Sequence, residues 1–132
     1  MTTSFLYLIS LSMKPYQDAR VEGEKLAKQY AELEQADQVD FYNGLEVYYS
    51  VLGHNKKQEA IAVLIEKNDH KIYVYQLDKG ISQDKAATIS REKGASDIDK
   101  ITFGRYQDKP IWEVKSGNQY YLVDFETGAV IQ

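Results

Sequence analysis

The sequence predicts an α+β protein built from two tandem units, each with one helix packed on a three-stranded antiparallel sheet. Apolar and polar residues alternate with a period of two in most of the predicted strands, which is typical of antiparallel strands with one buried face. The order of a helix followed by a meander of strands occurs twice, about sixty residues apart. We place the first unit at residues 14–79 and the second at residues 80–132, after a leader of residues 1–13.

The composition narrows the classes of function. The chain of 132 residues has 16 basic and 20 acidic side chains, without a basic cluster. This argues against a nucleic acid partner, because neutralising phosphates requires clustered cations. The sequence has no cysteine, which excludes disulfides and thiolate metal sites. We expect no metal, no cofactor and no small-molecule substrate. The 11 tyrosines lie mostly in predicted strands, where they suit sheets and contact surfaces.

The N-terminal leader contains a continuous apolar run, FLYLISL, at residues 5–11, followed by Lys14. The run is far shorter than the roughly 20 residues that cross a bilayer. It also lacks the basic region and cleavage site of a signal peptide. One interpretation is the outer end of a membrane anchor whose earlier part is cut off, with Lys14 just outside the membrane. The other is a segment that packs on the domain. We expect the anchor, because such a run is otherwise hard to place in a small domain.

The first unit is predicted to begin with a helix at Pro15, a residue favoured in the first helical turn. Its buried stripe repeats every three or four residues until the helix ends near Ala36. Three strand-like runs follow, at residues 40–52, 59–66 and 71–77, with turns at 53–56 and 68–70. The predicted stripe consists of Ala19, Gly23, Leu26, Tyr30 and Leu33.

The second unit begins after the boundary that residues 78–80 suggest. Ser82 has the position of a helix N-cap, and Gly94 is a natural helix stop. Residues 98–106 are predicted to form a strand, followed by a turn at 107–110. Residues 111–131 then form three short strands with tight turns at 116–118 and 126–128. In the first of these strands Trp112 and Val114 share one face, and Glu113 and Lys115 share the other.

The two units correspond strand by strand. Residues 48–51 match 111–114, residues 60–65 match 120–125, and residues 71–75 match 129–131. A copy of this size would be marginally stable alone. We therefore expect the two copies to pack on each other or to share a helix–sheet surface.

The second unit resembles a PepSY domain through Gly104, the WEV of residues 112–114 and the YYLVDFETGAV of residues 120–130. The order MKPY at 13–16, FYNGLEVYY at 41–49 and DKGIS at 78–82 extends the match. Over about residues 13–132 the chain resembles the cell wall elongation regulator TseB-like proteins of Gram-positive bacteria.

This resemblance implies a short cytoplasmic tail, one membrane helix and two PepSY-like units outside the cell. It implies a membrane-tethered, non-enzymatic adaptor or regulator on the extracytoplasmic face, acting through contact with a penicillin-binding protein in cell wall elongation. The family has no shared catalytic motif. PepSY units elsewhere suggest an alternative, an inhibitor or propeptide-like modulator of a secreted peptidase.

Several polar residues have patterns known from reactive sites. The SQDK at 82–85 matches the Ser-x-x-Lys nucleophile pattern of penicillin-binding proteins, and the KSG at 115–117 resembles their third motif. The chain is far too short for that fold, so we expect Ser82 to cap the helix. We also expect His54 and His70 to be exposed in turns, Asp97 and Asp99 to lie in a solvated turn, and Asp124 to bond to the following turn.

Four tyrosines are the candidate partner-binding residues. If Tyr49 and Val51 face the first helix, then Tyr48, Tyr73 and Tyr75 face the open side of the first sheet. Tyr120 takes the equivalent place in the second sheet, beside Glu113 and Lys115. Tyrosine is enriched at binding surfaces because it offers a large contact area with a polar tip. The alternative is that the open faces of the two units bury one another.

Overall fold

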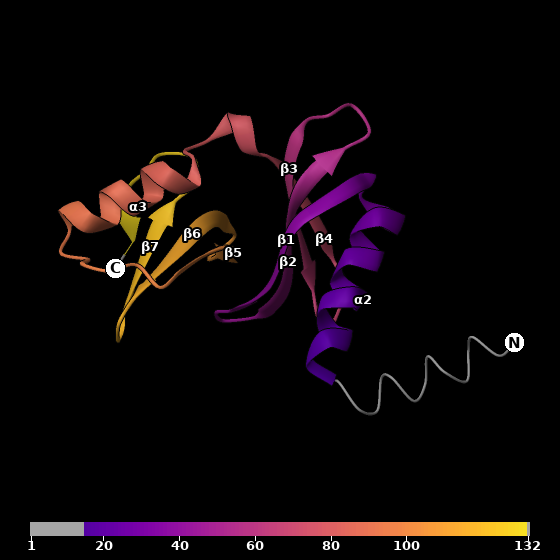
Figure 1. The fold of residues 1–132 in the computed structure, drawn as a ribbon, viewed down its shortest axis with the longest axis horizontal. Helices are drawn as coiled ribbons and strands as arrows, with labels where there is room; N and C mark the ends of the chain where they lie inside the picture. The colour runs from indigo at the N-terminus through magenta and orange to yellow at the C-terminus, as the bar shows by residue number, and fades with distance from the viewer. Residues whose placement is uncertain (1–14, 132) are drawn as a thin grey trace, which may run out of the picture.

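The computed structural model describes residues 15–131, with side chains from residue 21 onward. It contains two four-stranded antiparallel sheets, and each sheet is preceded in the chain by one helix (Figure 1). The α+β class and the repetition of a helix and a meander are therefore confirmed. The first half comprises α2 (Pro15–Tyr30), β1 (Leu33–Asn43), β2 (Val47–Asn55), β3 (Ala60–Glu66) and β4 (Ile72–Gln76). The second comprises η1 (Leu77–Lys79), α3 (Gln83–Glu92), β5 (Lys100–Tyr106), β6 (Lys109–Ser116), β7 (Gln119–Asp124) and β8 (Val130–Ile131).

The prediction of three strands per sheet was wrong. The second sheet has four strands because the strand predicted at 98–106, β5, pairs with the three predicted at 111–131. The first sheet gains a strand because the first helix is shorter than expected. The helix ends at Tyr30, and Glu32 has a left-handed φ of 57°, a conformation that cannot continue a helix. The chain turns there into β1, which pairs antiparallel with β2. The predicted single strand at 40–52 is in fact the end of β1, the turn at 44–46 and the start of β2. The apolar residues expected on the last helical turn belong to this strand instead.

One face of the first sheet packs on α2. Val39, Val51 and Val63 are direct cross-strand neighbours on this face, and all three are buried. Ala27 is the fully buried contact of the helix, whereas Tyr30, predicted in the buried stripe, is 61% exposed. The stripe therefore faces the sheet only up to the last helical turn.

One face of the second sheet packs on α3. Phe103, Trp112 and Val123 are cross-strand neighbours there, in the same hydrophobic cluster as Ala86 of the helix. Trp112 Nε1 donates a hydrogen bond to the backbone oxygen of Ile81 at 3.0 Å, which satisfies the polar atom of a buried ring. The predicted faces of β6 are confirmed, since Trp112 and Val114 are buried on this side.

The two halves are joined by β5, which packs against the face of the first sheet opposite α2. Tyr42 of β1 lies directly against Gly104 of β5, where an added Cβ would stand 2.5 Å from the tyrosine ring. Tyr42, Tyr48 and Leu64 of the first sheet form one buried cluster with Phe103 of β5. The first sheet is therefore covered on both faces, whereas the second sheet has α3 on one face and only the edge of the first half on the other.

The predicted membrane anchor at residues 5–11 lies outside the described residues. Within residues 15–131, no helix is both long and apolar enough to cross a membrane.

We predict that Gly104→Ala destabilises the protein by about 1–3 kcal/mol, because the new methyl group overlaps the ring of Tyr42. Urea denaturation of the variant would measure the loss. Tyr42→Leu removes the obstructing ring, so the double variant should lose less stability than the two single losses added together. A Gly104→Ala variant as stable as the parent would show that the two halves do not pack closely at this point.

Candidate functional site

Three of the four candidate tyrosines meet around one arginine. We call Tyr48, Tyr73, Tyr75 and Arg105 the tyrosine–arginine junction. The guanidinium carbon of Arg105 lies 3.9 Å from the ring centroid of Tyr73, a cation–π contact. Arg105 Nε donates to the hydroxyl of Tyr75 at 3.1 Å, and Nη1 donates to Asp108 at 3.2 Å. Arg105 belongs to β5 and the tyrosines to β2 and β4, so this arginine fastens the second half to the first.

The junction leaves its tyrosines unequally exposed. Tyr48 is 4% exposed, and its ring lies edge-on to Tyr73 at 6.3 Å between centroids. Tyr73 and Tyr75 are half-buried. On this sheet the open face is buried between the two halves, as the alternative expectation had it. A partner contact through these three residues or through Tyr120 remains a prediction.

Tyr120 lies apart from the other three, on the open face of the second sheet. It is 59% exposed and sits opposite Lys115 in the register of β6 and β7. The tip of the β1–β2 hairpin carries Leu45, which is 73% exposed. Both residues line a groove of about 580 Å³, which we call the Tyr120 groove. Its lining comprises Tyr42, Gly44, Leu45, Lys93, Tyr106, Glu113, Gln119, Tyr120, Tyr121, Leu122, Val130 and Ile131.

A second hollow of about 470 Å³ adjoins the Tyr120 groove, because Glu113 and Tyr120 line both. It adds two basic side chains, Lys100 and Lys115. Burial raises the pKa of Glu113, and the charge of Lys100 opposes that rise. Lys100 Nζ also lies 3.2 Å from Asp40 of the first sheet. The face thus combines one exposed aromatic ring, that of Tyr120, with charges of both signs.

An acidic hollow lies beside the tyrosine–arginine junction. It measures about 230 Å³, and Glu46, Glu66 and Asp69 line it together with Tyr48 and Tyr73. Hydrogen bonding to the carboxyl group of Glu46, then burial, then hydrogen bonding to Asp69 raise the pKa of Glu66 to about 7. Glu66 therefore changes its charge close to neutral pH.

The residues with catalytic patterns have structural roles. Ser82 Oγ accepts a hydrogen bond from the backbone N–H of Lys85 at 3.0 Å, which confirms the predicted helix cap. Ser116 Oγ donates to the backbone oxygen of Asp97 at 2.7 Å. Asp124 accepts from the backbone N–H groups of Glu126 and Thr127, which confirms the predicted bond to the following turn. In each case the polar side chain stabilises a helix end or a turn.

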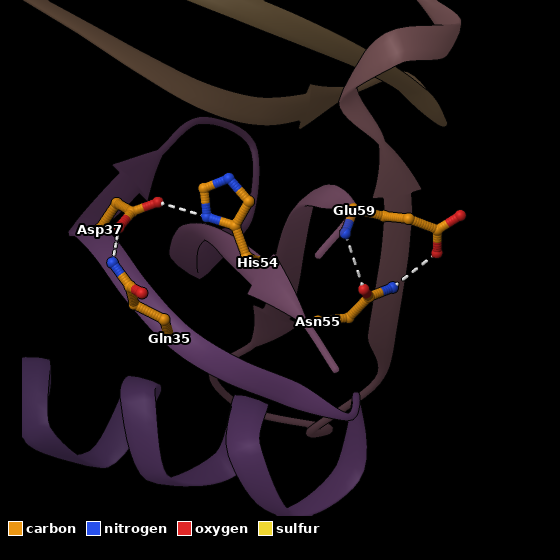
Figure 2. A network of polar contacts seen from close by, with 5 residues as sticks. All are labelled: Gln35, Asp37, His54, Asn55 and Glu59. Carbon is orange, nitrogen blue, oxygen red and sulfur yellow. Dashed lines mark hydrogen bonds and ion pairs between the residues drawn. The ribbon is translucent and has the colours of Figure 1, made fainter. Parts of the chain in front are cut away.

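His54 was predicted in a turn, but it lies in β2. Its Nδ1 is 2.9 Å from Asp37 of β1, and Gln35 donates to the same carboxylate at 2.8 Å (Figure 2). The turn begins after Asn55, whose side chain is bonded to the backbone and the carboxylate of Glu59 (Figure 2).

Across residues 21–131, no group of three or more His, Asp or Glu side chains is arranged to hold a metal ion.

Sequence reasoning missed Arg105 and Leu45. Ile101, Phe103 and Arg105 alternate in β5, so Arg105 falls on the side of the strand that the apolar residues occupy. A charge on an apolar face was the available signal, because a buried arginine requires partners. Leu45 gave no such signal, since its exposure depends on the unpredicted hairpin.

Comparisons with known proteins point in one direction. The model of the family described as "Cell wall elongation regulator TseB-like domain" matches residues 22–66. The probable cell wall elongation regulator TseB of Bacillus subtilis (strain 168) is 34% identical over 143 residues, covering 97% of this chain and 88% of the relative. The solved structure of the YpmB protein from Bacillus subtilis is 33% identical, with a TM-score of 0.71, and the alignment covers 89% of this chain and 94% of that chain.

We predict that Arg105→Lys lowers the free energy of unfolding by about 1–2 kcal/mol. Lysine keeps the charge but loses the planar stacking on Tyr73 and the directed bond to Tyr75. Urea denaturation would measure the change. Arg91→Lys, at the exposed end of α3, is the matched control and should be neutral. Equal stability of both variants would mean that Arg105 does not fasten the halves.

The raised pKa of Glu66 predicts a pH-dependent stability. The pKa is about 7 in the folded protein against an ordinary value of 4.5, so the folded state binds the proton more tightly than the unfolded state between these values. The stabilisation from this proton is full below pH 4.5 and is lost as the pH rises through 7. Melting temperatures from pH 5 to 8 should therefore fall by less in Glu66→Gln than in the parent. A parallel decline in both would contradict the assignment.

Proposed function

Because the chain belongs to the cell wall elongation regulator TseB-like family, we propose that it regulates cell wall elongation by binding a penicillin-binding protein. The observation that carries the proposal is the 34% identity to a protein named as such a regulator, over 97% of this chain. In this proposal the protein is a non-enzymatic adaptor, and its effect on the synthase comes from contact alone.

The contact is proposed to involve the open face of the second sheet, centred on Tyr120. Tyr120 and Leu45 are the two large, exposed apolar side chains beside the Tyr120 groove. Tyrosine is a frequent anchor of protein interfaces, and the exposed leucine adds apolar area beside it. Lys115 and Glu113 at the rim supply polar contacts that orient the partner.

The adaptor is proposed to be tethered to the extracytoplasmic face of the cell membrane through an N-terminal anchor, whose outer end is the apolar run at residues 5–11. Support comes from the sequence, since the apolar run at 5–11 ends just before α2 begins at Pro15. Such a tether confines the protein to the surface on which the synthase works, and this raises their effective concentration. Membrane fractionation of the chain, with and without residues 1–13, tests this part of the proposal.

We predict that Tyr120→Ser and Leu45→Ser each weaken binding of the penicillin-binding protein by about tenfold or more, as loss of an interface anchor does. Both side chains are exposed, so the melting temperature should change little. Crosslinking in cells, followed by purification from membranes, measures the binding. Tyr30→Ser is the matched control, because Tyr30 is 61% exposed at the end of α2.

Two outcomes would contradict this prediction. If Tyr30→Ser abolished crosslinking and Tyr120→Ser did not, the contact face would lie on the first half. If the parent protein never crosslinked to a penicillin-binding protein, the proposed partner would be wrong whichever face is used.

A further inference from the structure

The acidic hollow is formed by three segments that are distant in the sequence. The β1–β2 hairpin contributes Glu46, the end of β3 and the following turn contribute Glu66 and Asp69, and β5 with its following turn contributes Arg105 and Asp108. The rings of Tyr48 and Tyr73 line the same space. Its volume of about 230 Å³ suits the charged end of one side chain rather than a whole small molecule.

Glu66 is the unusual member of this group. The residue is 7% exposed, and it lies beside Tyr48 in the register of β2 and β3. Within residues 21–131 no cationic side chain forms an ion pair with its carboxylate. Its hydrogen-bonding neighbours are the carboxyl groups of Glu46 and Asp69. A buried carboxylate ordinarily has a cationic or N–H partner, because burying an unpaired charge is costly.

The cations around the hollow do not supply that partner. Arg105 is bonded to Tyr75 and Asp108 and stacked on Tyr73, and no ion pair joins it to Glu66. Lys71 lines the hollow but is exposed, and no ion pair joins it to Glu66. The charged groups that face the space are Glu46, Glu66, Asp69, Lys71, Arg105 and Asp108, a net deficit of two positive charges if all are ionised.

We propose that the acidic hollow receives a lysine or arginine side chain of a protein partner, whose positive charge pairs with Glu66. The lining favours an organic cation over a metal ion, because no three acids within residues 21–131 are grouped to hold a metal ion. The entering cation takes the place of the proton that Glu66 otherwise holds. The inference rests on the proposed function only for the identity of the partner, because the hollow itself requires only a positively charged side chain.

A capped tetralysine peptide is a suitable probe, with the same peptide acetylated on all four lysines as its uncharged counterpart. Binding to the whole chain would be followed by NMR chemical shifts at low ionic strength and pH 8. We expect the charged peptide to shift resonances around Glu66 and Tyr48, and the acetylated peptide to leave them unchanged. Because this assay contains no penicillin-binding protein, its result stands apart from that of the crosslinking experiment.

Two variants make the test specific. Glu66→Gln keeps the shape of the side chain and removes its charge, so it should weaken binding by about fivefold or more. Glu126→Gln, an exposed acid in the β7–β8 turn, is the matched control and should bind like the parent. If Glu66→Gln failed to fold, Glu46→Gln on the exposed hairpin removes a charge from the same hollow and should also weaken binding.

The pH dependence is a second readout. With a pKa of about 7, Glu66 is mostly ionised at pH 8 and mostly protonated at pH 6. The parent should therefore bind the peptide about tenfold more weakly at pH 6, and Glu66→Gln should lose most of this difference. Equal binding by the parent and Glu66→Gln would overturn the proposal, as would binding of the acetylated peptide. The same shifts with calcium alone would replace it with a metal site.

Discussion

The packing of β5 across the first sheet is the constraint on which the rest of the structure depends. At its centre the ring of Tyr42 lies against the backbone of Gly104, an approach that any larger residue would prevent. Phe103 continues the contact, lying 4.9 Å from the ring of Trp112 and 5.7 Å from that of Tyr75 between centroids. The hydrophobic core of the second half is thereby continuous with the face of the first sheet opposite α2.

This packing decides which surfaces remain for a partner. The first sheet has α2 on one face and β5 on the other, so its tyrosines are used mainly inside the molecule. The second sheet has α3 on one face and only the edge of the first half on the other. Its open face therefore keeps Tyr120 in solvent. The two similar units therefore expose different surfaces. The second unit covers a face of the first sheet, whereas the equivalent face of the second sheet stays open.

The charged residues at the boundary between the halves also differ in whether they are paired. Arg105 lies at the boundary and contacts the ring of Tyr73, the hydroxyl of Tyr75 and the carboxylate of Asp108, so its charge is balanced within the chain. Glu66 lies on the other side of the boundary, in the first sheet, and its neighbours are the carboxyl groups of Glu46 and Asp69. Arg105, whose charge is balanced, holds the two halves together. Glu66, whose charge is not balanced within the described chain, is the group that we propose pairs with a cation.

Local patterns in the sequence determined much of the fold. The alternation of Trp112 and Val114 with Glu113 and Lys115 predicted the faces of β6, and Ser82 and Gly94 marked the ends of α3. These features depend on neighbours in the chain, and a single sequence shows such neighbours directly. The repeated order of elements also followed from the sequence, since both copies carry the same alternation.

Only the tertiary structure decided where α2 ends and which tyrosines are buried or exposed. The apolar residues of β1 fit a helical stripe as well as a strand, and pairing with β2 settled the choice in favour of the strand. Alternation placed Tyr48 and Tyr120 on equivalent open faces, but whether such a face meets solvent or the other half is a long-range question. Tyr48 is buried because β5 crosses its sheet, and Tyr120 is exposed because no element of the described chain covers it fully. The sequence thus determined which side of each strand is apolar, and the docking of the two halves decided which sides stay accessible.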